Sequence, residues 1–457
     1  MIPVVTPEQM RAIDAGADEP VEALIARAGE AVARVAVEML GGTYGRTVNV
    51  LAGPGNNGAD GRVAAERLTA RNVRVRVLDA TDLPDELPPS ELVIDAAFGT
   101  GFRADRAGTA SWRPPSVGRV PVLAVDIPSG LDGATGVAAE GTLAATTTVT
   151  FVALKPGHLL GRGPDLVGDL RVASIAGLTA DGAEPAMGIV TAGDVAEWVP
   201  PRGRTDHKWV SAVRVVAGSP PMLGAASLCA AAAHRAGAGL VALSVPGSEG
   251  RAPVEVIERP VPDGEWADDV LADLHRFQSL VVGPGLGRAD DTRRSVARLV
   301  EQSDLPVVVD GDGLAALPWN AEGRVDFLRE RVGPVVLTPH DGEYGLLTGR
   351  RPGVDRVADA HRLVALTGAV VLLKGPTTIV ADPSGTTYFV TNGDERLATA
   401  GTGDVLAGVI AALLARGAQP AHAAAAGAWI HAAAAAHGPR RGLVASDLLL
   451  ELPGVLP

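Results

Sequence analysis

The chain has 457 residues, a length typical of two or three domains. Hydrophobic residues make up 47% and charged residues 20%, a composition that excludes a disordered or collagen-like protein. Acidic residues outnumber basic ones, and the net charge of −13 repels phosphate backbones, so we expect no nucleic-acid partner.

The cysteine content and the longest apolar run bear on the compartment. Cys229 is the only cysteine and cannot form an internal disulfide, and the first residues lack a signal-peptide pattern. The apolar run 405–415 is shorter than the roughly 20 residues that a membrane span needs. We therefore expect a cytoplasmic protein without membrane contact. Cys229 lies in an alanine-rich segment, where we expect a small buried side chain.

Short β-rich segments alternate with helical segments in the first half of the chain. This alternation predicts an α/β domain with a mostly parallel sheet. The expected strands are 47–52, 73–78, 92–95, 122–126, 147–152 and 170–174, and the expected helices include 20–40 and 59–71.

A second α/β series follows residues 198–204, a stretch rich in proline, glycine and arginine that is typical of a linker. No repeat relates the two series, so we predict two different α/β domains, 1–192 and 193–457. The expected strands of the second are 213–217, 240–245, 280–282, 306–310, 335–338, 370–374, 378–381 and 387–390, and its expected helices are 223–236, 292–302, 403–416 and 421–436.

A glycine-rich turn follows the first expected strand, with the sequence GPGNNGADG at 53–61. Glycines let the backbone approach a ligand, and the free N–H groups at a helix start favour phosphate. The turn matches G-x-G-x-x-G, which alone is weak evidence, because an ordinary tight turn from strand to helix gives the same pattern.

Two further loops, 95–103 and 126–132, follow later strands on the same rim. Neither Asp95 nor Asp126 has an arginine or lysine beside it, so we expect a cation or a shared proton to relieve their repulsion. Amide, carboxylate and hydroxyl oxygens suit potassium or magnesium. The alternative is that each aspartate simply caps the end of a strand.

Lysine is rare in this chain: Lys155, Lys208 and Lys374 are the only three. A compact ammonium approaches an anion differently from a planar guanidinium, so these positions are candidates for a functional charge. The alternative for each is an ordinary solvated charge.

The second half contains LATAGTGDVLAG at 397–408, which runs into a long apolar segment. Two glycines at a helix start expose N–H groups that can hold a transferring phosphoryl group. Asp404 beside them is placed to accept a proton from an attacking hydroxyl, whereas the alternative is an acid that only favours the helix dipole. The turn 310–312 is a candidate magnesium neighbourhood or a solvated turn, and His340 is expected to make a polar contact.

The motifs GPGNNGADG, DAAFGTGF, VDIPSGLDGATG and TVTFVALKPGHLLG resemble the YjeF N-terminal domain, the NAD(P)H-hydrate epimerase, over roughly residues 1–190. The resemblance implies a Rossmann-like three-layer fold. The chain departs from the family at Ala59, usually glycine, and at Ile25 and Ala26, usually a Met-Glu pair. The resemblance implies a potassium site at Asn57, Asp95 and Ser129. It also implies that Asp126 lies against the nicotinamide ring as the proton-transfer group. The hydrated dinucleotide would be held by Asn56, Asn57, Gly58, Ala59, Asp60, Gly99, Thr100, Gly101, Phe102, Arg103, Ala104 and Asp105.

The motifs GPGLG, TPHDGE, LKGPTT and AGTGDVLAG resemble the ribokinase-like superfamily and its YjeF C-terminal domain, the ADP- or ATP-dependent NAD(P)H-hydrate dehydratase, over roughly residues 195–457. Departures from that family are Trp209, Ala212, Met222 and Asp341. The resemblance implies a hydrate site at Ala225, Gly285, Gly287, His340 and Asp404, and a site for ADP or ATP with Mg²⁺ at Lys374, Gly375, Pro376, Thr377, Thr378 and Gly403.

Together the two resemblances imply a bifunctional enzyme that repairs hydrated NADH and NADPH. One domain would interconvert the R and S epimers, and the other would dehydrate the S form at the expense of ADP or ATP. We expect a homo-oligomer. The alternative is a ribokinase-like vitamin or sugar kinase fused to a dinucleotide-binding domain without catalytic activity.

Overall fold

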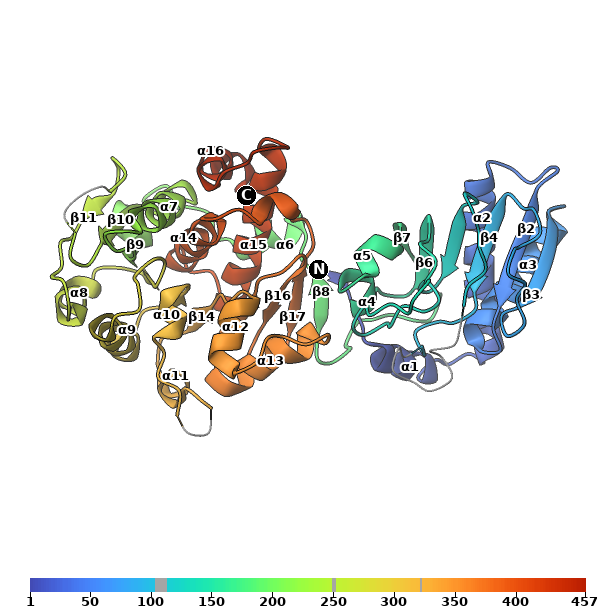
Figure 1. The fold of residues 1–457 in the computed structure, drawn as a ribbon, viewed down its shortest axis with the longest axis horizontal. Helices are drawn as coiled ribbons and strands as arrows, with labels where there is room; N and C mark the ends of the chain where they lie inside the picture. Colours follow the sequence, from blue (N-terminus) through green and yellow to red (C-terminus); the bar gives the residue numbers. More distant parts are fainter. Residues whose placement is uncertain (103–112, 249–251, 321–322) are drawn as a thin grey trace. The chain divides into compact units, whose positions relative to one another are not determined.

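The computed structural model describes residues 1–102, 113–248, 252–320 and 323–457 (Figure 1). Two compact units make up the chain, Ile2–Ala186 and Met187–Pro457. Each unit is built on its own largely parallel sheet, which confirms the predicted α/β class. Among the described helices, none is both long and apolar enough to cross a membrane.

The sheet of the N-terminal unit has the strand order β3-β2-β4-β5-β6-β7, and every neighbouring pair is parallel. Its strands are β2 (Thr47–Ala52), β3 (Arg74–Asp79), β4 (Leu92–Ala96), β5 (Val122–Val125), β6 (Thr147–Phe151) and β7 (Asp169–Ala173). The unit also contains β1 (Ile2–Pro3), α1 (Pro7–Ala15), α2 (Val21–Leu40), α3 (Asn56–Ala70), α4 (Pro156–Leu159) and α5 (Gly163–Leu166).

Helices α2 and α3 pack together on one face of this sheet (Figure 1). Their apolar residues, such as Val32 and Leu68, are fully buried against alternate strand residues, such as Val50 and Ile94. Burial of these side chains is the main term that holds the helices on the sheet. The N-terminus of α3 is thereby fixed at the carboxyl end of β2, where the glycine-rich turn lies.

The turn from β2 into α3 requires glycine at two positions. A Cβ atom on Gly53 would lie 1.9 Å from the carbonyl oxygen of Ala97, and one on Gly58 would lie 1.9 Å from that of Gly53. Backbone atoms of the loop after β4 and of the turn itself therefore leave no room for a side chain at these two positions. Ala59 lies inside α3, where an alanine in place of the family's glycine is compatible with helix.

The sheet of the C-terminal unit has the order β8-β17-β16-β15-β14-β13-β12-β9-β10-β11, antiparallel only around β16. Its strands are β8 (Met187–Ile189), β9 (Ala212–Val216), β10 (Leu240–Ser244), β11 (Ile257–Glu258), β12 (Ser279–Val282), β13 (Val307–Val309), β14 (Val335–Leu337), β15 (Val370–Leu373), β16 (Thr378–Ala381) and β17 (Thr387–Val390).

The helices of this unit cover its sheet and place one long apolar helix, α14, at the centre of the core. They are α6 (Ala192–Trp198), α7 (Leu223–Arg235), α8 (Ala267–Leu274), α9 (Asp290–Gln302), α10 (Asp312–Ala315), α11 (Asp326–Glu330), α12 (Asp341–Thr348), α13 (Arg356–Thr367), α14 (Thr402–Ala415), α15 (Pro420–His437) and α16 (Ala445–Val455), with short 3₁₀ segments at Lys208–Ser211 and Glu395–Leu397.

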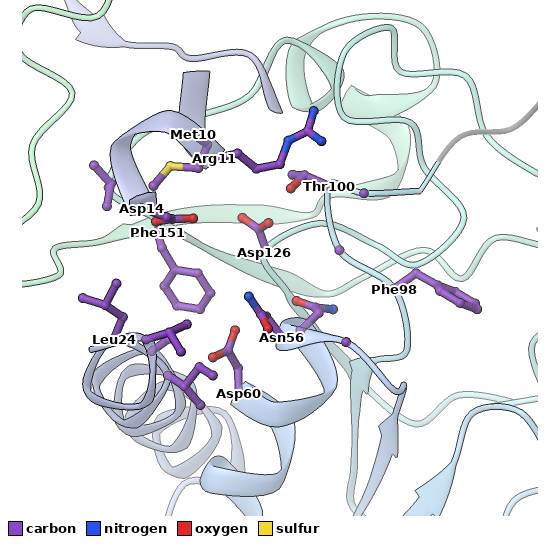
Figure 2. Close-up of a pocket in the computed structure, with 18 of the residues that line it drawn as sticks. Met10, Arg11, Asp14, Leu24, Asn56, Asp60, Phe98, Thr100, Asp126 and Phe151 are labelled. Carbon is purple, nitrogen blue, oxygen red and sulfur yellow. The ribbon is translucent and has the colours of Figure 1, made fainter. Parts of the chain in front are cut away.

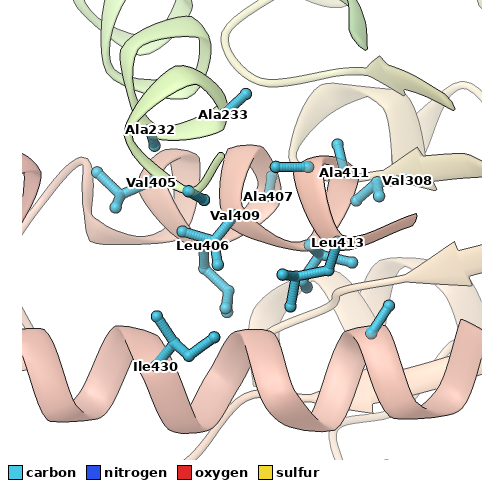
Figure 3. Close-up of a cluster of buried hydrophobic side chains, with 14 of the residues drawn as sticks. Ala232, Ala233, Val308, Val405, Leu406, Ala407, Val409, Ala411, Leu413 and Ile430 are labelled. Atoms are coloured by element: carbon cyan, nitrogen blue, oxygen red, sulfur yellow. The ribbon is translucent and has the colours of Figure 1, made fainter. Parts of the chain in front are cut away.

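Helix α14 packs between α7 and α15, as Figure 3 shows for its buried side chains. Val405, Val409 and Leu413 are completely buried, and Gly408 lets the backbone of α7 approach closely, since a Cβ atom there would lie 2.2 Å from the carbonyl oxygen of Cys229. Cys229 is buried as expected, and burial raises the pKa of its thiol. This packing fixes α14, and with it Asp404 in its first turn.

The stretch 198–204 lies inside the C-terminal unit, although its composition is typical of a linker. Strand β8 pairs with β17 in parallel, and α6 contacts α15 before the chain reaches this stretch. The boundary between the units in the structure falls at Ala186 and Met187, ahead of the expected 192 and 193. The physical reason is that the apolar side chains of residues 187–199 complete the core of the second sheet.

Candidate active sites

The N-terminal unit holds a cavity of about 490 Å³ at the carboxyl ends of its strands. Helices α1, α2 and α3 and the loops after β4, β5 and β6 supply its lining (Figure 2). Eight residues predicted to contact the hydrate line it: Asn56, Asn57, Asp60, Gly99, Thr100, Gly101, Phe102 and Asp126. Gly58 and Ala59 lie in α3 behind it, and Arg103, Ala104 and Asp105 lie outside the described residues.

Asp126 and Lys155 form a buried ion pair at the floor of this cavity. Lys155 Nζ donates to Asp126 Oδ1 at 2.7 Å and to Thr150 Oγ1 at 2.8 Å, and the lysine side chain is 1% exposed. Burial raises the pKa of Asp126, but the Lys155 charge and the hydrogen bonds from Lys155 and Thr150 more than offset it and hold the pKa below its ordinary value. Asp126 is therefore a carboxylate at neutral pH.

This ion pair corrects the expectation that Asp126 lacks a basic partner. The partner lies 29 residues away in sequence and reaches Asp126 because β5 and β6 are neighbouring parallel strands. Asp126 and Val152, which also lines the cavity, both have φ of 64°, a left-handed conformation that residues other than glycine rarely adopt. Such strained backbone is characteristic of functional sites.

His158 supports Asp126 from behind. The Lys155 backbone N–H donates to His158 Nδ1 at 3.1 Å, so the ring proton is on Nε2 and donates to the carbonyl oxygen of Asp126 at 3.0 Å. Burial lowers the pKa of His158 to about 4, and the charge of Lys155 adds to that effect. The imidazole is thus neutral and fixes the backbone of Asp126 rather than exchanging protons with the cavity.

Asp95 and Ser129 are in direct contact beneath the loop that contains Gly99. Ser129 donates from its backbone N–H to Asp95 Oδ2 at 2.9 Å and from its hydroxyl to Oδ1 at 2.5 Å. Asp95 is fully buried, and burial raises its pKa, although the bonds from Ser129 oppose that shift. Among the described residues, no lysine or arginine pairs with it.

Asn57 reaches the same loop: a Cβ atom on Gly99 would lie 3.3 Å from Asn57 Oδ1. Asn57 is 9% exposed, and its buried Nδ2 has no hydrogen-bond partner in the described part of the chain. Asn57, Asp95 and Ser129 thus offer hard oxygen donors close to the loop that contains Gly99, and the Asp95 carboxylate is buried without a counter-charge among the described residues. This is a donor set that fits a monovalent cation.

In the C-terminal unit, three neighbouring parallel strands bring Asp310, Thr338 and Lys374 together at their carboxyl ends. Lys374 Nζ donates to Asp310 Oδ1 at 2.6 Å, and Thr338 Oγ1 donates to the same atom at 2.7 Å. Burial lowers the pKa of Lys374, but the charges of Asp310, Glu343 and Asp404 and the hydrogen bond to Asp310 together outweigh it and raise the pKa overall. The lysine is therefore a fixed positive charge at the sheet edge.

Asp404 lies beside this lysine, in the first turn of α14. A Cβ atom on Gly403 would be 3.3 Å from Lys374 Nζ, which places the ammonium at the helix start. Burial raises the pKa of Asp404 to about 6; Asp310 and Glu343 add to the rise, and Lys374 opposes it. Its carboxylate is half-buried and accepts no hydrogen bond from any residue of the described ranges, so it is available to a substrate.

The glycine-rich turn after β12 meets the start of α7. Gly285 has φ of 63°, and a Cβ atom there would lie 2.9 Å from that of Ala225, so only glycine allows this approach. The Gly287 N–H donates to Asp312 Oδ2 at 2.9 Å. Asp310 and Asp312 are thus bound to other groups, and the described residues contain no cluster of three His, Cys, Asp or Glu side chains that could hold a metal ion.

His340 makes the polar contact expected of it, as the N-cap of α12. Its Nδ1 accepts from the N–H groups of Gly342 at 2.9 Å and Glu343 at 3.2 Å, and the side chain is 58% exposed. Asp341, where the family has proline, pairs with Arg356 at 2.9 Å, and Arg356 donates to the carbonyl oxygen of Lys374 at 2.8 Å. The departure at Asp341 therefore supports the 374–378 turn.

Comparison with known proteins decides between the two families considered from the sequence, the repair enzymes and the vitamin or sugar kinases. The family model described as NAD(P)H-hydrate dehydratase matches residues 213–453, and that described as YjeF-related protein N-terminus matches residues 21–85 and 78–157. The bifunctional NAD(P)H-hydrate repair enzyme Nnr of Salinibacter ruber is 35% identical over 99% of this chain and 96% of its own length. The chain belongs to the bifunctional NAD(P)H-hydrate repair enzymes.

A second curated relative supports this assignment, and a solved structure shares part of the fold. The repair enzyme Nnr of Mycobacterium leprae is 38% identical over 90% of this chain and 89% of its own length. A solved structure of a hypothetical protein from Streptococcus mutans has a TM-score of 0.50 at 20% identity, covering 59% of this chain and 98% of that one. At this identity, the likeness to the solved structure concerns the fold alone.

Sequence reasoning gave no role to Asp14 and His158, and it treated Lys155 only as a candidate functional charge and Asp310 only as part of a candidate magnesium neighbourhood. Lys155, His158 and Asp14 surround Asp126, and Asp310 anchors Lys374. One signal was available for Lys155: it is among only three lysines and lies within the quoted motif TVTFVALKPGHLLG. The third lysine, Lys208, is exposed, which favours the interpretation that it is an ordinary solvated charge.

Proposed function

We propose that the chain repairs hydrated NADH and NADPH at two separate sites. The N-terminal cavity interconverts the R and S epimers, and the C-terminal unit dehydrates the S epimer with ADP or ATP. The observation that carries the proposal is Asp404, a half-buried carboxylate without a hydrogen-bond partner among the described residues, next to the Lys374 ammonium at a helix N-terminus. That combination of base, cation and helix start suits phosphoryl transfer.

The dehydration has two steps. In the first, Asp404 accepts the proton of the hydrate's hydroxyl, whose oxygen attacks the terminal phosphorus of ADP or ATP, and the bond to the leaving AMP or ADP breaks. In the second, the new ester's carbon–oxygen bond breaks, phosphate leaves, and the neighbouring carbon loses a proton to restore the ring double bond. Phosphate leaves far more readily than hydroxide, which explains a kinase-like fold in a dehydratase.

Lys374 and the N–H groups at the start of α14 would hold the transferring phosphoryl group, with Gly375, Pro376, Thr377 and Thr378 around the nucleotide. Mg²⁺ would arrive bound to the nucleotide phosphates and neutralise part of their charge. Because Asp310 already fixes the Lys374 ammonium at 2.6 Å, the cation is in place before the nucleotide binds. Ala225, Gly285, Gly287 and His340 would line the hydrate.

In the N-terminal unit, Asp126 is the proton-transfer group of the epimerase, and the cavity residues from α3 and the loop after β4 would hold the dinucleotide. We place potassium at Asn57, Asp95 and Ser129, where it would compensate the buried Asp95 charge. A cytoplasmic location and a homo-oligomeric state remain predictions from the sequence, the latter open to light scattering.

The deciding experiment incubates the full chain with a mixture of both hydrate epimers, ADP and Mg²⁺, and follows the absorbance of reduced nicotinamide. Complete recovery supports two active sites, whereas recovery of only the S fraction indicates an inactive epimerase. A stable phosphate ester in the mass spectrum, without recovered absorbance, would instead identify a vitamin or sugar kinase. Asp404→Asn should abolish recovery, and Glu330→Gln, at an exposed position in α11, is the matched control.

A further inference from the structure

Asp60 is a buried carboxyl group in the epimerase cavity whose role the ion pair of Asp126 does not explain. It is 8% exposed, lies in the second turn of α3, and lines the same cavity as Asp126. Figure 2 shows both carboxyl groups directed into that space, one from α3 and the other from the loop after β5. Within the described ranges, Asp60 has no hydrogen-bond or ion-pair partner.

We propose that Asp60 is a second catalytic residue of the epimerase, the acid that protonates the leaving hydroxyl while Asp126 acts as the base. This inference rests on the proposed function of the N-terminal unit and assigns two distinct proton-transfer roles within it. An unpaired carboxyl group that is more than nine-tenths buried is stable only when protonated, so it reaches the substrate as a donor.

The surroundings of Asp60 set its protonation opposite to that of Asp126. Burial raises its pKa to about 8, and the negative charges of Asp126 and Asp14 add to the rise. Helix α2 presents only uncharged side chains to the cavity, and the other charged groups that line it are Lys155, paired with Asp126, and Arg11, paired with Glu8. Two carboxyl groups with pKa values pushed apart are the usual basis for an acid and a base in one site.

The apolar wall that α2 presents to the cavity contributes to this environment. Leu24, Ile25 and Ala28 form the α2 wall of the cavity, and Figure 2 shows this helix beside Asp60. The wall carries no polar group that could hydrogen-bond an ionised Asp60. In this chain the carboxyl group is therefore kept neutral by hydrocarbon.

The step balances as follows. Water adds to an enamine at the carbon bonded to nitrogen, so the hydrate's hydroxyl lies beside the ring nitrogen. Asp60 gives its proton to that hydroxyl, the carbon–oxygen bond breaks, water leaves, and the nitrogen lone pair forms a carbon–nitrogen double bond. A second water adds to the opposite face and its proton passes to Asp126, whose Oδ2 accepts no bond from a described residue.

After this turnover Asp60 is ionised and Asp126 is protonated, which is the starting state for the reverse conversion. Exchange with water restores the original state. The net reaction inverts one carbon and consumes nothing, as an epimerase requires.

The test uses the full-length protein without nucleotide, so that the dehydratase is idle, and follows conversion of one purified epimer into the other by chromatography. Rates without enzyme are subtracted at each pH. We expect kcat/KM of the unmodified protein to fall as pH rises above about 8, where Asp60 ionises. Asp60→Asn should lose about a hundredfold or more, the usual contribution of a general acid.

Glu66→Gln, at an exposed position on the same helix α3, is the matched control and should leave the rate and its pH profile unchanged. Ile25→Gln adds a hydrogen-bond donor to the α2 wall and should move the alkaline fall to lower pH, because it stabilises the ionised form. If Asp60→Asn fails to fold, the pH profiles of kcat/KM for Ile25→Gln and for the unmodified protein still test whether Asp60 is the acid.

The proposal is overturned if Asp60→Asn, properly folded, keeps its rate within about threefold, well short of a general acid's contribution. It is equally overturned if the unmodified protein shows no alkaline fall up to pH 10 or if Ile25→Gln leaves that fall in place. If the unmodified protein does not interconvert the epimers at all, the proposed epimerase function itself fails, which is a different result.

Discussion

The pH dependence of dehydration tests whether Asp404 is the base. Burial and the neighbouring carboxylates raise its pKa from 3.8 to about 6. The difference corresponds to roughly 3 kcal/mol against the ionised form. A base with this pKa is about nine-tenths ionised at pH 7 and about one-tenth at pH 5, so kcat/KM should fall about tenfold between them.

The assay measures initial rates of nicotinamide absorbance recovery on the S epimer with saturating ADP, with a blank without enzyme at each pH. Glu343→Gln removes one of the charges that raise the pKa of Asp404, so it should move the acid limb to lower pH. A rate that is constant from pH 7 to pH 5 would refute the reasoning, because an unperturbed aspartate stays ionised throughout that range.

Stability gives an independent readout of the same group. The raised pKa means that the folded state binds the proton more tightly than the unfolded state, so this contribution to stability is complete below pH 3.8 and is lost as pH rises through about 6. Asp404→Asn should therefore raise the Tm at pH 8 and leave it nearly unchanged at pH 4. An equal Tm gain at both pH values would contradict this assignment.

Two further predictions concern the packing and the ion pair. Gly408→Ala places a Cβ atom 2.2 Å from the Cys229 carbonyl oxygen, and we expect it to destabilise the protein by about 1–3 kcal/mol. The control Gly454→Ala in α16, with open space around it, should be neutral or stabilising. Urea denaturation compares the two variants, and equal midpoints would refute the close approach of α7 and α14. Lys155→Met leaves Asp126 buried without its counter-charge, so we expect the free energy of unfolding to fall by about 3–5 kcal/mol. The variant should lose epimerase activity but still dehydrate the S epimer. Full epimerisation by this variant would rule out a role for the ion pair.

Strand positions followed from the sequence with small errors at their ends. The expected strands 47–52, 378–381 and 387–390 coincide with β2, β16 and β17, because runs of β-branched and aromatic residues between turn residues are local signals. The helix expected at 59–71 begins earlier in the structure, at Asn56. The Gly-Asn-Asn segment is typical of a turn, but Gly55, in extended conformation, is the N-cap of α3, so both asparagines belong to the helix.

Charge partners did not follow from the sequence. The Asp126 expectation was wrong because its ammonium comes from Lys155, a residue that only the parallel pairing of β5 and β6 brings near. Asp310 and Lys374, 64 residues apart, meet for the same reason at the ends of β13 and β15, on either side of β14. Sequence distance carries no information about such pairs.

The sequence by itself determined the α/β class, the glycine turns, and the positions of Asp126 just after a strand and of Asp404 in the first turn of a helix. These features depend on local periodicity and backbone sterics. Only the tertiary structure decided which carboxyl groups are ionised: Asp60 and Asp126 are the same residue type, and burial beside apolar α2 or beside the Lys155 ammonium separates them. Protonation depends on solvent exclusion and on charges within a few ångströms, and both are properties of the folded chain.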